Sequence, residues 1–176
     1  MLGVTGSIAA YKAAEIASRL AREGACVTVV MTESAQRLVG HATFESLSRR
    51  PVVTDLWERA QIVQPGHIGL AEQAEALLVA PATANFMAKL AHGLADDALS
   101  CVALAAECPL VIAPAMNDRM YAHPATQANV ATLRERGAFI VEPAEGRLAS
   151  GKIGGKGRLA DIPEIIDALR AALAER

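Results

Sequence analysis

Aromatic residues are scarce in this chain, since only 3% of its 176 residues are Phe, Trp or Tyr whereas 52% are hydrophobic. The core must therefore consist of Ala, Val, Leu and Ile, which suits parallel strands covered by alanine-rich helices. The chain also lacks a run of roughly 18–20 apolar residues, the length of a membrane span. It has no basic segment before an apolar stretch at its N-terminus, as a signal peptide would. We therefore expect a single cytoplasmic domain over residues 1–176.

Net charge and metal-binding patterns are equally sparse. The formal charge of −2 gives no reason to expect nucleic acid or an anionic membrane as a partner. Cys26, Cys101 and Cys108 lie in apolar surroundings, so we expect buried free thiols and neither a disulfide framework nor a metal site. The four histidines show no metal-ligand spacing, which likewise predicts no metal.

Strand and helix patterns alternate along the chain. Such alternation predicts an α/β fold, with a doubly wound, mostly parallel sheet and helices on both faces, as in Rossmann-like proteins. In such sheets ligands bind beyond the carboxyl ends of the strands. The strand patterns occupy residues 1–6, 25–32, 75–83, 108–117 and 138–143, and the helical patterns occupy 7–24, 34–48, 84–106, 123–136 and 162–176.

The segment "GVTGSIA" marks the first strand-to-helix turn. Gly6 permits a close approach of the backbone, and Ser7 offers a hydroxyl beside the N–H groups of the helix start. This pattern is typical of an anion site, most naturally for a phosphate. It does not match the G-x-G-x-x-G fingerprint of dinucleotide-binding proteins. An ordinary helix N-cap turn is the alternative.

Two further strand-terminal loops, "APATAN" and "APAMN", place proline, small residues and asparagine directly after apolar strands. Small side chains let a flat ligand lie against the backbone, and Thr83, Asn85 and Asn117 offer hydrogen-bonding groups. Each loop alone is typical of a plain turn. Together with a phosphate-type turn in the same sheet, they favour a ligand site.

His67 lies in "PGHIGLAEQAE", at the expected start of a helix. An imidazole at the mouth of a ligand cleft is a natural general base near neutral pH. A surface histidine without a catalytic role is the alternative interpretation.

These segments, in this order, resemble the homo-oligomeric flavin-containing cysteine decarboxylases, and most closely the phosphopantothenoylcysteine decarboxylase branch of coenzyme A biosynthesis. The resemblance covers essentially the whole chain. "PAMN" followed by "MY", with the upstream "HI", is specific to that family. The matching segments are "GVTGSIAAYKA" at 3–13, "GHIGLAEQAE" at 66–75, "APATAN" at 80–85, "PAMNDRMY" at 114–121 and "GRLASGKIGGKGRL" at 146–159.

The resemblance implies FMN at the strand ends, with its phosphate near Gly6, Ser7 and Ile8. The remaining residues that it implies around the cofactor are Thr32, Ser34, Thr83, Ala84, Asn85, Ser100 and Met116.

The implied substrate is a small molecule that ends in cysteine, 4'-phosphopantothenoylcysteine, and the implied product is 4'-phosphopantetheine. In this family FMN oxidises the thiol-bearing carbon to a thioaldehyde, carbon dioxide leaves, and the enethiol that remains is reduced. Loss of carbon dioxide beside a thiocarbonyl needs orientation more than strong acid catalysis. His67 matches the catalytic histidine of the oxidative half-reaction, and Asn117 matches the residue that binds the substrate carboxylate and amide.

The glycine-rich segment at about 145–160 resembles the substrate flap of the family, whose "ACG" motif supplies a cysteine as proton donor. Here Ala149, Ser150 and Gly151 stand in its place, with Lys152 beside them for an anionic substrate. A serine hydroxyl is a far weaker acid than a thiol, whose pKa is about 8.5. Three explanations remain open: Ser150 relays a proton from water or Lys152, the reaction stops at the enethiol, or the serine is an engineered trap.

Other classes compete with this interpretation. A flavin prenyltransferase of similar fold would bind FMN without requiring the His67 and Asn117 motifs, and non-catalytic phosphatase subunits also resemble the family. The flavin prenyltransferase is the nearest rival enzyme, and a decarboxylase of peptidyl-cysteine that stops at the enethiol is a further enzymatic alternative. The resemblance further implies a homotrimer with the active site between subunits, or a dodecamer of four trimers. It also implies a fused or separate CTP-dependent ligase domain.

Overall fold

A computed structural model of the protein describes residues 1–57, 66–147 and 153–175. Its main sheet has five parallel strands in the order β2-β1-β3-β4-β5, which confirms the predicted Rossmann-like α/β class. The strands are β1 (Leu2–Val4), β2 (Val29–Met31), β3 (Leu77–Ala82), β4 (Leu110–Pro114) and β5 (Phe139–Ile140).

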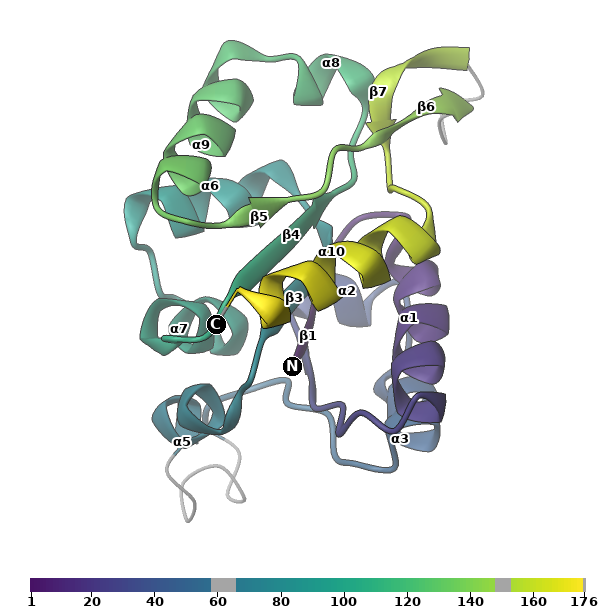
Figure 1. Ribbon diagram of the computed structural model, residues 1–176, viewed down its shortest axis with the longest axis vertical. Coiled ribbons are helices and arrows are strands. Elements are labelled where there is room, and N and C mark those ends of the chain that lie inside the picture. The colour runs from purple at the N-terminus through teal and green to yellow at the C-terminus, as the bar shows by residue number, and fades with distance from the viewer. Residues whose placement is uncertain (58–65, 148–152, 176) are drawn as a thin grey trace.

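Helices cover both faces of the sheet (Figure 1). One face is covered by α1 (Ala10–Arg22), α3 (His41–Ser48) and α10 (Ile162–Ala174). The other face is covered by α6 (Ala84–His92), α7 (Ala98–Ala105) and α9 (Pro124–Glu135). The shorter helices are α2 (Glu33–Gln36), α5 (Gly66–Gln73) and α8 (Asp118–Tyr121).

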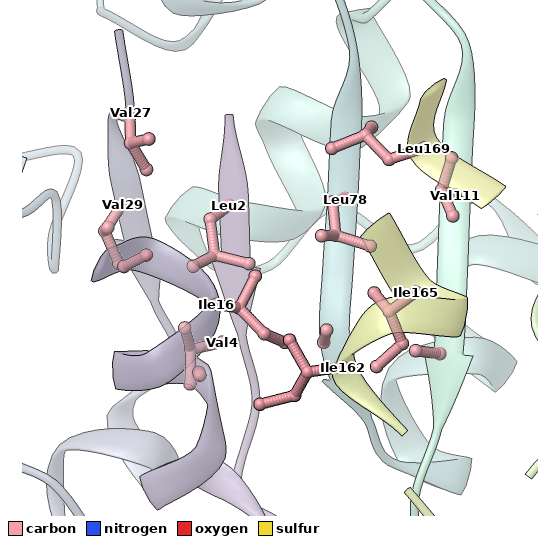
Figure 2. Close-up of a cluster of buried hydrophobic side chains, with 14 of the residues drawn as sticks. Leu2, Val4, Ile16, Val27, Val29, Leu78, Val111, Ile162, Ile165 and Leu169 are labelled. Carbon is pink, nitrogen blue, oxygen red and sulfur yellow. The ribbon is translucent and has the colours of Figure 1, made fainter. Parts of the chain in front are cut away.

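The two faces have separate aliphatic cores because successive strand side chains point to opposite sides of the sheet. Leu78 packs beneath α1 and α10 with Ile16 and Ile165, all fully buried (Figure 2). Its neighbours Leu77 and Val79 pack on the other face with the residues of α6, α7 and α9. Burial of each such side chain contributes about 1.5–3 kcal/mol to stability. This packing holds the strand ends, and the loops that follow them, in fixed positions.

A second, two-stranded sheet was not predicted. The strands β6 (Ala144–Arg147) and β7 (Ile153–Arg158) pair in antiparallel fashion within the segment expected only to be a glycine-rich flap. Glycine is depleted in strands, so the run of glycines hid the strand pattern. The α1 helix also starts later than predicted, because Ser7 N donates to Thr5 O at 2.8 Å and Ala10 N to Ser7 O at 2.8 Å, which makes residues 6–9 a turn.

The expected burial of the cysteines was wrong, although all three are free thiols. Cys26 is exposed in the connection between α1 and β2, where its Sγ accepts a 2.8 Å hydrogen bond from Arg50 Nη1. Cys101 is half-buried within α7, and Cys108 is half-buried just before β4. Over the described ranges of the chain, none of the helices has the length and apolar character needed to cross a bilayer.

Candidate functional site

The order of the strands reverses between β1 and β3, which are neighbours in the sheet although β2 separates them in the chain. A crevice at such a reversal, beyond the carboxyl ends of the strands, is the usual ligand site of an open α/β sheet. A cavity of about 360 Å³ lies there. Its lining comprises Thr5, Gly6, Thr32, Glu33, Ser34, Thr83, Asn85, Phe86, Lys89, Asp96 and Asp97, and so includes five of the residues predicted to hold the cofactor.

Two larger cavities lie at the opposite end of the sheet. One, of about 660 Å³, is lined by Leu110 and Phe139, the first residues of β4 and β5. The other, of about 500 Å³, is lined by Met1 and Ala76, which precede β1 and β3. Since parallel α/β sheets bind ligands beyond their carboxyl ends, the 360 Å³ cavity is the candidate functional site.

Gly6 brings the turn after β1 against the helix that follows β2. A Cβ atom on Gly6 would lie 2.4 Å from the Cβ of Ser34, so no larger residue fits without displacement of the turn. Within the described part of the chain, the N–H groups of Gly6 and Ile8 have no hydrogen-bond acceptor. Ser7 is only 8% exposed. Free N–H groups just before a long helix make this turn able to bind an anion.

Thr5 joins the two strands at the reversal, and the sequence interpretation missed it. Its side chain is almost fully buried, and its Oγ1 donates to Pro81 O at 2.7 Å. The same oxygen accepts a 3.0 Å hydrogen bond from Thr83 N. A hydroxyl directly after a buried strand was the available signal, but which strand lies beside β1 cannot be read from local sequence.

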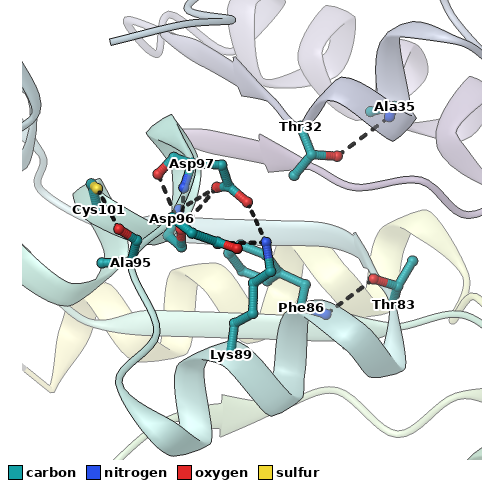
Figure 3. A network of polar contacts seen from close by, with 10 residues as sticks. Thr32, Ala35, Thr83, Phe86, Lys89, Ala95, Asp96, Asp97 and Cys101 are labelled. Atoms are coloured by element: carbon teal, nitrogen blue, oxygen red, sulfur yellow. Dashed lines mark hydrogen bonds and ion pairs between the residues drawn. The ribbon is translucent and has the colours of Figure 1, made fainter.

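Thr32 and Thr83 are helix N-caps on opposite sides of the cavity. The Oγ1 of Thr32 accepts from Ala35 N at 3.3 Å, and the Oγ1 of Thr83 accepts from Phe86 N at 3.2 Å (Figure 3). Each hydroxyl keeps its hydrogen for donation to a ligand. The predicted residues Ala84 and Asn85 form the first turn of α6, and Asn85 is exposed at the cavity.

Lys89 forms the charged wall of the cavity together with two aspartates (Figure 3). Its Nζ lies 2.6 Å from Asp96 Oδ1 and 2.8 Å from Asp97 Oδ2. Partial burial acts to lower the pKa of Lys89, but the hydrogen bonds to the two carboxylates outweigh it and the pKa is raised. The hydrogen bond from Lys89 lowers the pKa of Asp96. Lys89 and Asp96 therefore hold their charges around neutral pH.

Ser100, which the family resemblance places near the flavin, is fully buried behind this wall. It forms a capping box with Asp97, in which Ser100 N donates to Asp97 Oδ1 at 2.8 Å and Asp97 N donates to Ser100 Oγ at 3.0 Å. Ser100 therefore affects the cavity indirectly, because its hydrogen bonds position Asp97, which lines the cavity. The D-x-x-S spacing at 97–100 was the signal for this cap, and the sequence interpretation did not use it.

Met116 and Asn117 follow β4, beside the loop of β3. Met116 N donates to Gly157 O at 2.9 Å, so the loop pairs with strand β7. The Oδ1 of Asn117 accepts from Arg119 N at 3.0 Å as the N-cap of α8. This bond leaves the Nδ2 of Asn117 as a donor for a bound group.

His67 lies away from the cavity. It is the second residue of α5, which packs against α7 and leads into the amino end of β3. In Figure 1, α5 lies at the bottom of the molecule, whereas α8 and the β6–β7 hairpin lie at the top. The imidazole of His67 is half-exposed and has no hydrogen-bond partner among the described residues. One copy of the chain therefore does not bring His67 and Asn117 together.

The remaining predicted site residues, Ala149, Ser150, Gly151 and Lys152, lie outside the described residues.

The fold and the strand-end cavity are those of an α/β flavin-binding class. A family model described as "Flavoprotein" matches residues 1–174, and the chain belongs to that family. Among curated proteins, it is 50% identical over 165 residues to the Coenzyme A biosynthesis bifunctional protein CoaBC of Mycobacterium tuberculosis, with 94% of this chain and 39% of the relative covered. It is 46% identical over 175 residues to the protein of the same name from Bacillus subtilis, with 99% and 43% covered. The chain thus spans about two fifths of the length of these relatives.

Solved structures of flavin-dependent proteins also share the fold of this chain. A cysteine-to-serine variant of PPC decarboxylase, complexed with pantothenoylaminoethenethiol, superimposes with a TM-score of 0.85 at 31% identity, with 97% of this chain and 94% of the other covered. The FMN-dependent cysteine decarboxylase SpaF has a TM-score of 0.77 at 39% identity, with 96% and 95% covered. The FMN-binding protein AtHal3 has a TM-score of 0.83 at 31% identity, with 99% and 96% covered.

Proposed function

We propose that the chain is an FMN-dependent carboxy-lyase that converts 4'-phosphopantothenoylcysteine to 4'-phosphopantetheine in coenzyme A biosynthesis. The observation that carries the proposal is that the anion-binding turn at Gly6 and the loop of Asn117 lie at the same end of one parallel sheet. The 50% identity to CoaBC over 94% of the chain supports this substrate class.

The residues of the cavity fit FMN. The free N–H groups of Gly6 and Ile8 suit its phosphate, and Thr32 and Thr83 suit its polar chain through their hydroxyl hydrogens. The carboxylates of Asp96 and Asp97 disfavour a second anion at the far wall, so they support placement of the phosphate at the Gly6 turn. When bound, the flavin would take up the two electrons removed from the thiol-bearing carbon of the substrate.

The protein residues have the tasks of binding and orientation. The Nδ2 of Asn117 would hold the substrate carboxylate, and the thiocarbonyl formed next to it would make loss of carbon dioxide easy. His67 would act as the base of the oxidative half-reaction. Because His67 lies at the opposite end of the subunit from Asn117, we assign the two residues to one site formed by neighbouring copies, in a trimer or in a dodecamer of trimers.

The first experiment uses the purified protein and 4'-phosphopantothenoylcysteine. We expect flavin absorbance near roughly 450 nm and release of carbon dioxide. The His67→Asn variant should keep its flavin and lose carbon dioxide release. A colourless protein that takes up no FMN would contradict the cofactor, and full activity of the variant would remove His67 from its role.

A mixing experiment tests the shared site. His67→Asn and Asn117→Ala should each be inactive alone, because each removes one half of every site. Co-expression of the two variants should restore activity, since some sites then combine an intact His67 from one copy with an intact Asn117 from the next. If the mixed protein stays inactive while remaining oligomeric, the shared site is wrong.

A second candidate function is oxidative decarboxylation that stops at the enethiol. It is favoured by Ser150 in place of the cysteine of the family motif, and by the 39% identity to the cysteine decarboxylase SpaF. Product masses separate the two functions, because the enethiol is two hydrogen atoms lighter than phosphopantetheine. If the enethiol accumulates, the Ser150→Cys variant should restore the reduction.

The ligase partner is also part of the proposal. The relatives are named as bifunctional proteins and are more than twice as long as this chain. Their length supports a CTP-dependent ligase of the same pathway as a partner, present either as a fused domain or as a separate protein.

A further inference from the structure

Gly157 packs against the loop that carries the predicted ligand residues. A Cβ atom on Gly157 would lie 2.6 Å from the carbonyl oxygen of Met116, 2.9 Å from the amide nitrogen of Asp118 and 3.1 Å from its Cα. All three are backbone atoms, which cannot move aside as the end of a long side chain can. Two backbones therefore touch at this point, on either side of Asn117.

Hydrogen bonds join the same two segments. Met116 N donates to Gly157 O at 2.9 Å, and Gly155 N donates to Asp118 Oδ2 at 3.3 Å. The residues before and after Asn117 are therefore both bonded to β7. The conformation of the Asn117 loop depends on how closely β7 approaches it.

The side chain of Glu142 supports β7 from another direction. Its Oε2 accepts from the Tyr121 hydroxyl at 3.2 Å and lies 3.7 Å from Lys156 Nζ. Tyr121 ends α8, the helix that Asn117 caps, and Lys156 stands next to Gly157 in β7. Arg134 of α9 also pairs with Glu142. Strand β7 is thus linked to both ends of helix α8, directly at Asp118 and through Glu142 at Tyr121.

We infer that Gly157 is a positioning residue for the substrate-binding group Asn117. The absence of a side chain at Gly157 lets β7 bond to Met116, and this bond sets the direction in which the Asn117 side chain leaves the loop. The inference rests on the proposed function only in assigning Asn117 to the substrate carboxylate; the contact between β7 and the loop does not depend on it.

The test compares Gly157→Ala with Gly155→Ala in the full-length, FMN-loaded protein. Gly155 is the matched control, because it lies in the same strand and a Cβ atom there would come no closer than 3.9 Å to Asp118 Cβ. Gly157→Ala should raise KM for 4'-phosphopantothenoylcysteine by about tenfold or more, with a smaller change in kcat and with FMN affinity retained, since a mispositioned group weakens binding of the substrate. Gly155→Ala should resemble the wild type.

Amide hydrogen exchange gives a readout that needs no substrate. The Met116 N–H should be protected in the wild type and in Gly155→Ala, and should exchange faster in Gly157→Ala while the amides of β3 and β4 stay protected. Wild-type exchange at Met116 in Gly157→Ala would overturn the inference, as would an unchanged KM despite faster exchange. If the wild type fails to decarboxylate the substrate, the proposed function fails, and the exchange data still decide whether Gly157 holds the loop.

Discussion

Thr5 and Pro81 are joined by a 2.7 Å hydrogen bond, from Thr5 Oγ1 to the Pro81 carbonyl, across the point where the strand order reverses. The donor and acceptor are 76 residues apart in the chain. The bond, together with the one from Thr83 N to the same hydroxyl, holds the two walls of the cavity in register. Because Thr5 also lines the cavity, a change at this bond should alter both the stability of the fold and the binding of a ligand.

Thr5→Val tests this join. The substitution keeps the shape and removes both side-chain hydrogen bonds. It leaves the Thr83 N–H unpaired, whereas the Pro81 carbonyl keeps only the 3.3 Å hydrogen bond from Thr5 N. We expect a loss of about 1–3 kcal/mol in the free energy of unfolding, measured by denaturant titration, and weaker FMN binding. Thr5→Ser, which keeps the hydroxyl, should lose much less. Equal free energies of unfolding for the two variants would show that the hydrogen bonds of the Thr5 hydroxyl do not contribute to stability.

Gly6→Ala tests the close approach of the first turn to α2. The new Cβ would lie 2.4 Å from Ser34 Cβ, so the turn must shift and its free N–H groups must turn away from the phosphate. We expect FMN affinity, measured by quenching of flavin fluorescence, to fall by about tenfold or more, which corresponds to about 1.4 kcal/mol. The double variant Gly6→Ala with Ser34→Gly removes the worst contact and should recover part of the affinity. No recovery would mean that the remaining contacts of the new Cβ with the backbone of residue 34, at 3.2 Å and 3.4 Å, are enough to displace the turn, or that the Ser34 hydroxyl itself holds the cofactor.

Lys89→Met tests the charged wall. The side chain keeps most of its length, but Asp96 and Asp97 lose their common cation beside the cavity. Because two uncompensated carboxylates repel an anion, FMN should bind about three- to tenfold more weakly. Adding Asp96→Asn to this variant should restore part of the affinity, and the loss should shrink at high salt because screening weakens the repulsion. A loss that neither change relieves would point to altered packing of α6.

The sheet and the strand-end loops with Gly6, Thr83 and Asn85 could be predicted from local sequence patterns, whereas Thr32 and Ser34 were predicted only from the family resemblance. It could not predict Thr5, Lys89 or Asp97, whose importance depends on which strands and helices become neighbours. The position of His67 shows the same limit. Its motif identifies it as catalytic by resemblance, but only the fold shows that it lies at the other end of the subunit from Asn117. The glycines of β7 were predicted only as part of a substrate flap, and the structure shows that Gly157 is in close backbone contact with the Asn117 loop.

Glu142→Gln tests how acid affects the contact between β7 and α8. Burial acts to raise the pKa of Glu142, but its hydrogen bonds with Arg134 and Tyr121 and the charge of Lys156 outweigh it and lower the pKa below the usual value of 4.5. A carboxyl group with a lowered pKa adds stability above its unfolded-state pKa and loses it as the pH falls through the folded-state value. The variant should therefore melt below the wild type at neutral pH, and the two melting temperatures should converge well below pH 4.5. The control Glu15→Gln removes an exposed carboxylate that has no ion pair among the described residues, so it should match the wild type at every pH. If the melting temperature of Glu142→Gln stays below that of the wild type by the same amount at every pH, the charge of Glu142 does not stabilise the contact. The side chain would then act only through packing.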